Sequence, residues 1–284
     1  MAALAPDEIL TMKILIFGAT GPSGDWLVRK CLEIYPDATL VLYVRSPGKL
    51  PRETVENPAV VVVEGQLYDL ETLVKAMDGV EVVLSSLGPT GPIYPSDTPL
   101  GKGYANIISA MQQQGVHRLI CLGTASIKDP DDKPSTKFWL IISGVRTLAH
   151  NAYKDIVAIG DAVRSSNLDW TIVRVPVLTN STSTDVVAGY VGDGQTGIFL
   201  SRAGFADFVV SEIGKREWIR KAPLISSHAG ETNDENQTCL EIIYRYTRLP
   251  CFSRSSHLNF AGSSWNFLNN SPPSLRPLTS LSQR

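Results

Sequence analysis

Short apolar runs alternate with amphipathic segments along the first 227 residues of the chain. The runs contain almost no polar side chains, which is typical of strands that are buried on both faces of a parallel sheet. The segments between them repeat their apolar residues at helical spacing and end at glycine or proline. The pattern predicts strands at Lys13–Phe17, Thr39–Val44, Val60–Glu64, Val80–Leu84, Arg118–Leu122 and Asp169–Val173.

The segments between these strands predict helices on both sides of the sheet. Helices are expected at Ser23–Tyr35, Leu70–Met77, Leu100–Gln114 and a long stretch, Thr136–Ser165, with a break near Gly144. Strands that alternate with helices in this order indicate an α/β fold of the Rossmann type. We therefore expect a doubly wound parallel sheet that is covered by helices on both faces.

The two ends of the chain differ from this central region. Residues 1–11 read as a leader, residues 12–227 as the Rossmann domain with its ligand cleft, and residues 228–284 as a tail rich in serine and asparagine. Too few apolar residues occur in the tail to offset the entropy of ordering it. We expect this tail to be poorly ordered and dispensable for ligand binding.

Composition and charge exclude several classes of function. A net charge of −2 argues against a nucleic-acid-binding surface that extends over the whole chain. No apolar run approaches the roughly 18 residues that span a bilayer. Asp7 and Glu8 stand where a signal peptide needs basic residues and then an apolar stretch. We therefore expect a cytoplasmic protein with no membrane contact. The four cysteines lie far apart, without metal-ligand spacing, so no metal site or disulfide is expected, and Cys31 and Cys121 read as buried apolar residues.

A glycine-rich turn follows the first predicted strand and precedes the first helix. Its spacing is G-x-x-G-x-x-G rather than G-x-G-x-x-G. A turn without side chains lets the backbone approach a pyrophosphate, and the following helix directs its free N–H groups at the anion. Strand, turn and helix in this order predict dinucleotide binding by Gly18, Thr20, Gly21, Pro22, Ser23 and Gly24.

The end of the second strand predicts which dinucleotide is bound. An acidic residue there would accept hydrogen bonds from the ribose of NAD, but this chain has Arg45, Ser46 and Lys49, and no acid before Glu53. A guanidinium, a hydroxyl and an ammonium suit a 2′-phosphate. NADP(H) is therefore expected, although a solvated basic turn is the alternative. Loops after the third, fourth and fifth strands, at Gly65–Asp69, Ser85–Gly91 and Thr124–Ser126, would complete the cofactor cleft.

Several motifs together resemble the atypical short-chain dehydrogenases/reductases, which include biliverdin-IXβ/flavin reductases, NmrA-like regulators and fungal averufin-oxidase-type proteins. The resemblance covers about residues 12–227 and rests on the segments Ile16–Gly21, Val44–Ser46, Gly115–Val116, Leu168–Arg174 and Ser201–Asp207. It implies a late helix at Ser201–Asp207 and a closing strand near Ala222–Ile225. It also implies that Arg45 contacts the 2′-phosphate and that the cofactor is lined by Ser85, Ser86, Leu87 and Gly88. Pro176 and Val177 are implied to lie beside the nicotinamide.

The chain departs from that superfamily in its catalytic pair. Typical members use Tyr-x-x-x-Lys, but Val157 stands four residues after Tyr153, and the neighbouring lysine, Lys154, is adjacent in sequence. Adjacent helical residues point about 100° apart, so at most one of this pair faces the cleft, and a solvated face is the alternative for both. Thr124 stands where relatives carry a serine near the substrate. Thr124, Tyr153 and Lys154 are the candidate catalytic residues.

The resulting expectation is an NADPH-dependent oxidoreductase, monomeric or homodimeric, acting on a small carbonyl, quinone, flavin or aromatic substrate. The resemblance to averufin-oxidase-type proteins makes a polyketide or other secondary metabolite a reasonable substrate class. Two alternatives remain open: a non-catalytic NADP(H) sensor of the NmrA-like type, favoured by the absent catalytic pair, and an accessory subunit of a biosynthetic assembly.

Overall fold

The sheet at the centre of the molecule is mainly parallel, as the sequence pattern predicts. The computed structural model describes residues 11–90 and 94–227. These residues all belong to one compact unit. Residues 1–10 of the expected leader, residues 91–93 and the whole expected tail lie outside the described residues. Within the described part, eight strands form one sheet in the order β3-β2-β1-β4-β5-β6-β10-β8.

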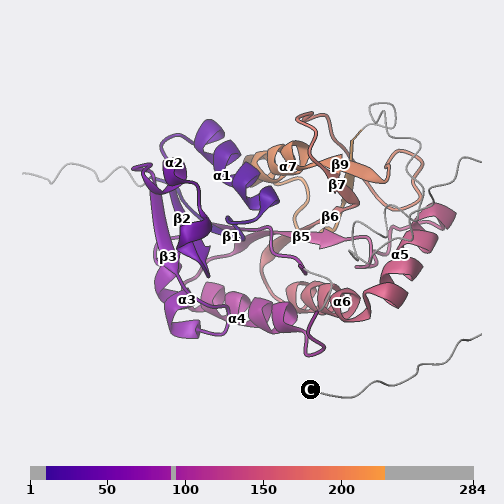
Figure 1. The fold of residues 1–284 in the computed structure, drawn as a ribbon, viewed down its shortest axis with the longest axis horizontal. Coiled ribbons are helices and arrows are strands. Elements are labelled where there is room, and N and C mark those ends of the chain that lie inside the picture. Colours follow the sequence, from indigo (N-terminus) through magenta and orange to yellow (C-terminus); the bar gives the residue numbers. More distant parts are fainter. Residues whose placement is uncertain (1–10, 91–93, 228–284) are drawn as a thin grey trace, which may run out of the picture. The chain divides into compact units, whose positions relative to one another are not determined.

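Six parallel strands make up the Rossmann core of this sheet, which confirms the predicted fold class (Figure 1). β1 pairs with β2 on one side and with β4 on the other, so the order of the strands reverses at β1. β10 continues the sheet parallel to β6, and β8 closes it antiparallel to β10. The strands of this sheet are β1 (Lys13–Phe17), β2 (Thr39–Val44), β3 (Val60–Glu64), β4 (Val82–Ser85), β5 (Arg118–Thr124), β6 (Asp169–Val175), β8 (Val187–Gly189) and β10 (Leu224–Ser226).

Helices cover both faces, because successive strand residues point to opposite sides. In β1, Leu15 and Phe17 belong to one core cluster and Ile14 and Ile16 to the other. Figure 1 shows α1 (Pro22–Ile34) and α7 (Arg202–Lys215) on one side, and α3 (Leu70–Ala76), α4 (Pro99–Gln113) and α6 (His150–Arg164) on the other. The remaining helices are α5 (Thr136–Leu148), the short α2 (Arg52–Val55) and a 3-10 turn at Pro47–Lys49.

The predicted thiol environments are confirmed for the two described cysteines. Cys31 and Cys121 are buried and unpaired. Burial raises the pKa of each thiol to about 12, so both remain protonated and behave as small apolar residues.

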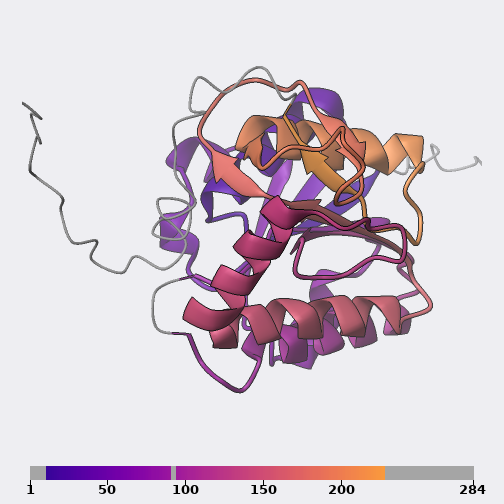
Figure 2. The same ribbon diagram turned by 90° about the vertical axis from the view of Figure 1, so that its right-hand side faces the viewer.

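The long helix after β5 is broken five residues later than the sequence predicts. The chain turns at Ala149, which joins α5 to α6 with φ −127° and ψ 48°, whereas Gly144 is helical. Figure 2 shows the two helices meeting at a steep angle. α6 packs on the sheet through Ile156, Ile159 and Val163, and α5 leaves the sheet, so packing rather than a glycine fixes the break.

The region after β6 is more regular than the sequence suggests. The sequence predicts no strand between Asp169–Val173 and the closing strand near Ala222–Ile225. In the structure, β7 (Val177–Thr179) pairs with β9 (Phe199–Ser201) in a separate two-stranded sheet, and β8 joins the main sheet. These strands are only three residues long, which is too short for a periodic signal.

Candidate active site

A cavity of about 1240 Å³ runs along the carboxyl ends of the parallel strands. It opens at the point where β1 separates β2 from β4, which is where doubly wound sheets bind their ligands. Residues that follow β1 to β6 line one side, and α5 and α6 contribute the opposite wall. One cavity therefore brings together segments from Phe17 to Arg202.

The glycine turn after β1 forms one end of this cavity. Gly18 has φ +82°, and a Cβ there would lie 2.6 Å from Ser86 Oγ. A Cβ on Gly24 would lie 2.0 Å from the Gly18 carbonyl oxygen, so only glycine allows α1 to begin this close to β1. No side chain caps α1, whose first turn lines the cavity with Pro22, Ser23 and Gly24. The free N–H groups suit an anionic ligand.

Basic side chains line the cavity beyond β2. Arg45 and Lys49 are exposed, and both line the cavity together with Ser46. Glu53, the nearest following acid in sequence, is an ion-pair partner of Arg29 at 3.2 Å and does not line the cavity. This corner therefore presents cations to a bound ligand.

The loop after β3 lies beside this basic corner. The Tyr43 hydroxyl donates a hydrogen bond to the Gln66 carbonyl oxygen at 3.0 Å, and a Cβ on Gly65 would lie 2.2 Å from the same hydroxyl oxygen. Burial raises the pKa of Tyr43 to about 12, which keeps this donor protonated. Tyr68, 80% exposed, lines the cavity and offers a flat surface to a planar ring.

The loop after β4 meets the glycine turn from the other side. Ser86, Leu87 and Gly88 line the cavity, but Ser85 does not. Ser85 is buried under the loop, and its hydroxyl is 2.7 Å from the hydroxyl of Tyr104 on α4. Ser85 thus fixes the loop to the core rather than contacting a ligand in the cavity.

The predicted residues beyond β5 and β6 all reach the cavity. Thr124, Pro176 and Val177 line it, as does Ser126. The Thr124 hydroxyl accepts a hydrogen bond from the Ser126 backbone N–H at 3.2 Å. The sheet therefore brings Thr124 to the same end as the predicted nicotinamide-contacting residues.

The structure separates the two candidates on α6. Tyr153 lines the cavity, whereas Lys154 is exposed on another face of the helix and takes no part in the lining. The next residue, Asp155, is fully buried and accepts hydrogen bonds from the Tyr94 hydroxyl at 2.6 Å and from the backbone N–H of Gly101 at 2.7 Å. Only Tyr153 of the adjacent pair is thus in a position to contact a substrate.

Sequence reasoning missed Tyr94 and the apolar wall of the cavity. Burial, followed by the hydrogen bond to Asp155, raises the pKa of Tyr94 above its ordinary value, and the tyrosine lines the cavity. The pattern of α5 carried a usable signal, because this helix is apolar on more than one face. The α5 residues that line the cavity are Phe138, Ile141, Ile142, Val145, Thr147 and Leu148.

Among the described residues, no cluster of histidine, cysteine or acidic side chains could hold a metal ion. None of the helices in the described part of the chain is long and apolar enough to cross a bilayer.

Curated relatives match parts of this chain. "Oxidoreductase GME11367" of Pestalotiopsis microspora is 23% identical over 185 residues, covering 62% of this chain and 69% of that protein. "Eugenol synthase 1" of Petunia hybrida is 41% identical over 81 residues, which is 27% of this chain and 26% of that protein. "Isoeugenol synthase 1" of Clarkia breweri is 32% identical over 89 residues, or 30% and 27% of the two chains. The chain thus spans only about a quarter of the length of these plant relatives.

Solved structures share the fold. A short-chain dehydrogenase/reductase from Veillonella parvula DSM 2008 in complex with NADP has a TM-score of 0.65 and 20% identity over 78% of this chain and 97% of that one. The profile of the NAD(P)H-binding family matches residues 18–216, which include the glycine turn and both cavity ends. The match confirms the predicted nicotinamide cofactor as NAD(P)H. The chain belongs to this NAD(P)H-binding family.

Proposed function

We propose that this protein is an NADPH-dependent oxidoreductase that reduces a small, mainly apolar carbonyl, quinone, flavin or other electron-poor aromatic compound. One observation carries the proposal: a single cavity joins a phosphate-binding turn and a basic corner to an apolar pocket that contains a few hydroxyl groups. A protein that only binds a dinucleotide does not require the apolar pocket at the other end of the cavity. A reductase needs both ends in one cavity, because the hydride donor and the acceptor must touch.

The basic corner supports NADPH over NADH. Arg45, Ser46 and Lys49 offer two cations and a hydroxyl to a 2′-phosphate, and Glu53 is held by Arg29 away from the cavity lining. Charge-assisted hydrogen bonds to phosphate are stronger than neutral ones. The adenine ring would lie against the Gly65–Tyr68 loop, with the pyrophosphate on the first turn of α1.

The residues at the nicotinamide end have separate roles in this proposal. Ser86, Leu87, Gly88, Pro176 and Val177 hold the ring, and the apolar wall from α5 excludes water from the acceptor. NADPH, when bound, supplies the hydride, and the chain positions both reactants and provides the proton. Thr124 would orient the acceptor oxygen by a hydrogen bond.

Tyr153 is the proposed proton donor to that oxygen. Its hydroxyl proton passes to the acceptor as the negative charge develops, and a proton from water restores the phenol. Tyr94, the other tyrosine at this end, is unsuited because its proton is already donated to the Asp155 carboxylate. The exposed Lys154 would then have no catalytic role, in contrast to the expectation from the sequence.

The apolar end supports an aromatic substrate. The α5 wall contributes the ring of Phe138 together with branched aliphatic side chains, and the cavity has hydroxyl donors in Thr124 and Tyr153. Planar aromatic compounds with a few oxygen atoms fit such a lining. Two of the relatives described above are plant synthases named for phenolic aromatics, eugenol and isoeugenol, which is consistent with a secondary-metabolite or polyketide-type substrate.

One observation favours a second candidate, a non-catalytic NADP(H) sensor. No lysine stands one helical turn after Tyr153, and the adjacent Lys154 lies outside the cavity. NADPH oxidation should be screened with quinones, flavins and polyphenols, beside a titration with NADP⁺. Turnover of at least one acceptor supports the reductase, whereas tight NADP(H) binding without turnover of any acceptor would assign the chain to the sensors.

A further inference from the structure

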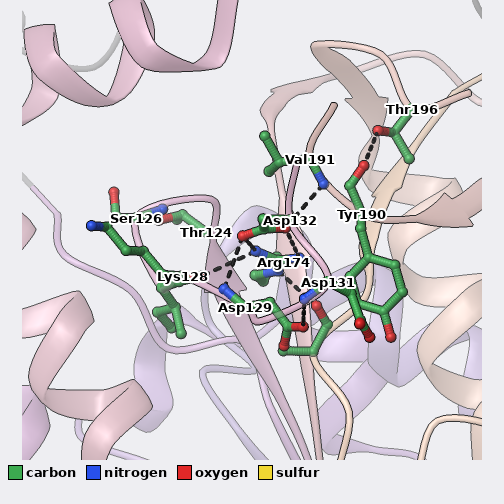
Figure 3. A network of polar contacts seen from close by, with 12 residues as sticks. Thr124, Ser126, Lys128, Asp129, Asp131, Asp132, Arg174, Tyr190, Val191 and Thr196 are labelled. Atoms are coloured by element: carbon green, nitrogen blue, oxygen red, sulfur yellow. Dashed lines mark hydrogen bonds and ion pairs between the residues drawn. The ribbon is translucent and has the colours of Figure 1, made fainter. Parts of the chain in front are cut away.

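A buried arginine, Arg174, lies at the centre of a network of polar contacts that joins several chain segments (Figure 3). Arg174, near the end of β6, is completely buried and donates to both carboxylate oxygens of Asp132, at 2.7 and 2.8 Å. Its remaining donors reach the carbonyl oxygens of Ala222 at 2.6 Å and Ile127 at 3.1 Å. The guanidinium carbon lies 6.0 Å from the centre of the Tyr190 ring. Arg174 thus ties the loop after β5 to the chain before β10.

The Asp132 carboxylate extends the connection to the turn after β8. It accepts hydrogen bonds from the backbone N–H groups of Asp129 at 2.8 Å and Val191 at 3.1 Å. In return, the Lys133 N–H donates to the Val191 carbonyl oxygen at 2.8 Å. The approach is close: Gly192 has φ +74°, and a Cβ there would lie 2.5 Å from the Lys133 carbonyl oxygen.

These three segments support the apolar wall of the cavity. A small core cluster is centred on Ala125, Phe138, Val191 and Leu224, with Ile142 and Ile198 packed against it. Ala125 follows β5, Phe138 lies on α5, Val191 lies in the turn after β8 and Leu224 begins β10. Its cavity-lining members are Ala125, Phe138, Ile142 and Ile198.

We propose that Asp132 and Arg174 are positioning residues for the acceptor: they fix the wall against which it binds, through α5 and the turn after β8, and leave the cofactor end unaffected. Neither residue lines the cavity, so both act through their neighbours. A bidentate pair suits this role, because its fork geometry fixes direction as well as distance. The inference rests on the proposed reductase function, since it assigns the substrate half of that site.

The chain offers a matched control in a second buried pair. Arg118 at the start of β5 contacts Glu212 of α7 at 2.9 Å, and their side chains are 3% and 2% exposed. Neither residue lines the cavity. Both pairs join a buried arginine to a carboxylate, although Asp132 is 18% exposed and Glu212 only 2%. Only the Arg174 pair supports the substrate wall.

Asp132→Asn and Glu212→Gln should therefore be compared with the wild type well below their unfolding temperatures. We expect Asp132→Asn to raise the KM for the acceptor about tenfold or more, because a displacement near 1 Å can cost about 10²-fold. Affinity for NADPH should stay within about twofold, and Asp132→Glu, which restores the carboxylate, should recover part of the loss. Glu212→Gln should lower stability but leave both constants near wild-type values.

A second pair of variants tests the same inference without removing a buried charge. Gly192→Ala places a methyl group against the Lys133 carbonyl, whereas Gly194→Ala carries similar backbone strain at φ +82° with no atom within 4 Å. Weaker acceptor binding in Gly192→Ala alone supports the inference. It is overturned if the two alanine variants behave alike, or if Asp132→Asn and Glu212→Gln change the acceptor KM equally.

Binding of menadione to the NADP⁺-saturated protein, followed by calorimetry, separates this inference from the proposed function. If the wild type binds menadione without turning it over, the reductase proposal fails, while weaker binding to Asp132→Asn still supports the positioning role. If the wild type binds no aromatic acceptor, the inference is contradicted as well.

Discussion

The two ends of the cavity are built by different means. At the cofactor end, the backbone of a seven-residue turn, Gly18–Gly24, meets the start of α1, and the fit depends on missing side chains. At the substrate end, Arg174 and Asp132 hold segments that are more than 40 residues apart in sequence, and the fit depends on charges that are present. The first construction is local in the chain and the second is not.

This difference determines how each end tolerates change. A methyl group added at Gly24 meets backbone atoms that cannot rotate away, so the loss is steric. A charge removed from the buried pair leaves its partner desolvated and unpaired, so the loss is electrostatic. Substitutions at one end should therefore leave ligand binding at the other end nearly unchanged.

The largest effect on turnover is expected at Tyr153, the proposed proton donor. Tyr153→Phe should lower kcat by about 10²–10³-fold, because a lost donor to developing charge costs about 2.7–4 kcal/mol. Thr124→Ala should remove only about 1 kcal/mol of transition-state stabilisation, because its hydroxyl positions the acceptor. Lys154→Ala should leave kcat unchanged. Steady-state kinetics with saturating NADPH give the ranking. Full activity in Tyr153→Phe would show that water supplies the proton.

At the cofactor end, Gly24→Ala should abolish tight NADPH binding. Its methyl group would lie 2.0 Å from the Gly18 carbonyl oxygen, so α1 must move away from the turn. Such overpacking costs about 1–3 kcal/mol of stability. Gly48→Ala is the control, because no atom lies within 4 Å of its added methyl group. NADPH titration measures the affinity of the two variants, and thermal unfolding measures their stability. Equal affinity and stability of Gly24→Ala and Gly48→Ala would contradict the steric account.

Arg45→Asp should change cofactor choice and nothing at the substrate end. Loss of one charge-assisted pair is worth about 1.5–3 kcal/mol, so NADPH affinity should fall by at least about tenfold. NADH lacks the 2′-phosphate and should bind as before or more tightly. Arg52→Asp, which alters a neighbouring surface ion pair with Glu56, is the control. Unchanged NADPH affinity in Arg45→Asp would disprove the assignment.

Acid should weaken the substrate end through Asp132. Burial raises the pKa of this carboxyl, but the hydrogen bonds and charge of Arg174 outweigh burial and hold the pKa below its ordinary value. The pair then stabilises the fold above the carboxyl's unfolded pKa, near 4, and the contribution is lost as pH falls through the folded pKa. The stability difference between wild type and Asp132→Asn should be constant from neutral pH to about 5 and shrink below about 4, by at most about 1.4 kcal/mol per pH unit. Denaturation with urea across this range measures it, and a constant difference would contradict the role of the charge.

The smallest effect is expected from the tail. Truncation after Ser227 should leave NADPH affinity and acceptor KM unchanged, because residues 228–284 have no core pattern of their own. The remaining chain keeps all strands of the described sheet. Loss of folding or of either constant would show that the active unit extends beyond the expected boundary.

Sequence reasoning succeeded where the signal was local. The order of strand, glycine turn and helix around Gly18 could be predicted, because neighbouring residues carry the signal. The position of the basic residues after β2 at the cavity could be predicted for the same reason. The direction of Tyr153 and Lys154 could not be predicted, since it depends on how α6 packs on the sheet. The orientation of Ser85 could not be predicted for a similar reason, since its hydroxyl is turned toward Tyr104 of α4. The contact between Asp132 and Arg174 had no sequence signal, because the two residues are 42 positions apart.

The central claim, that the two ends are independent, is tested most directly by a double-mutant cycle. NADPH affinity is measured for wild type, Arg45→Asp, Asp132→Asn and the double variant. Distant, independent sites add within about 0.3–0.5 kcal/mol, so Arg45→Asp should cost the same NADPH affinity in both backgrounds. A coupling of about 1 kcal/mol or more would contradict the account, because it would mean that the buried pair at the substrate end also shapes the cofactor site.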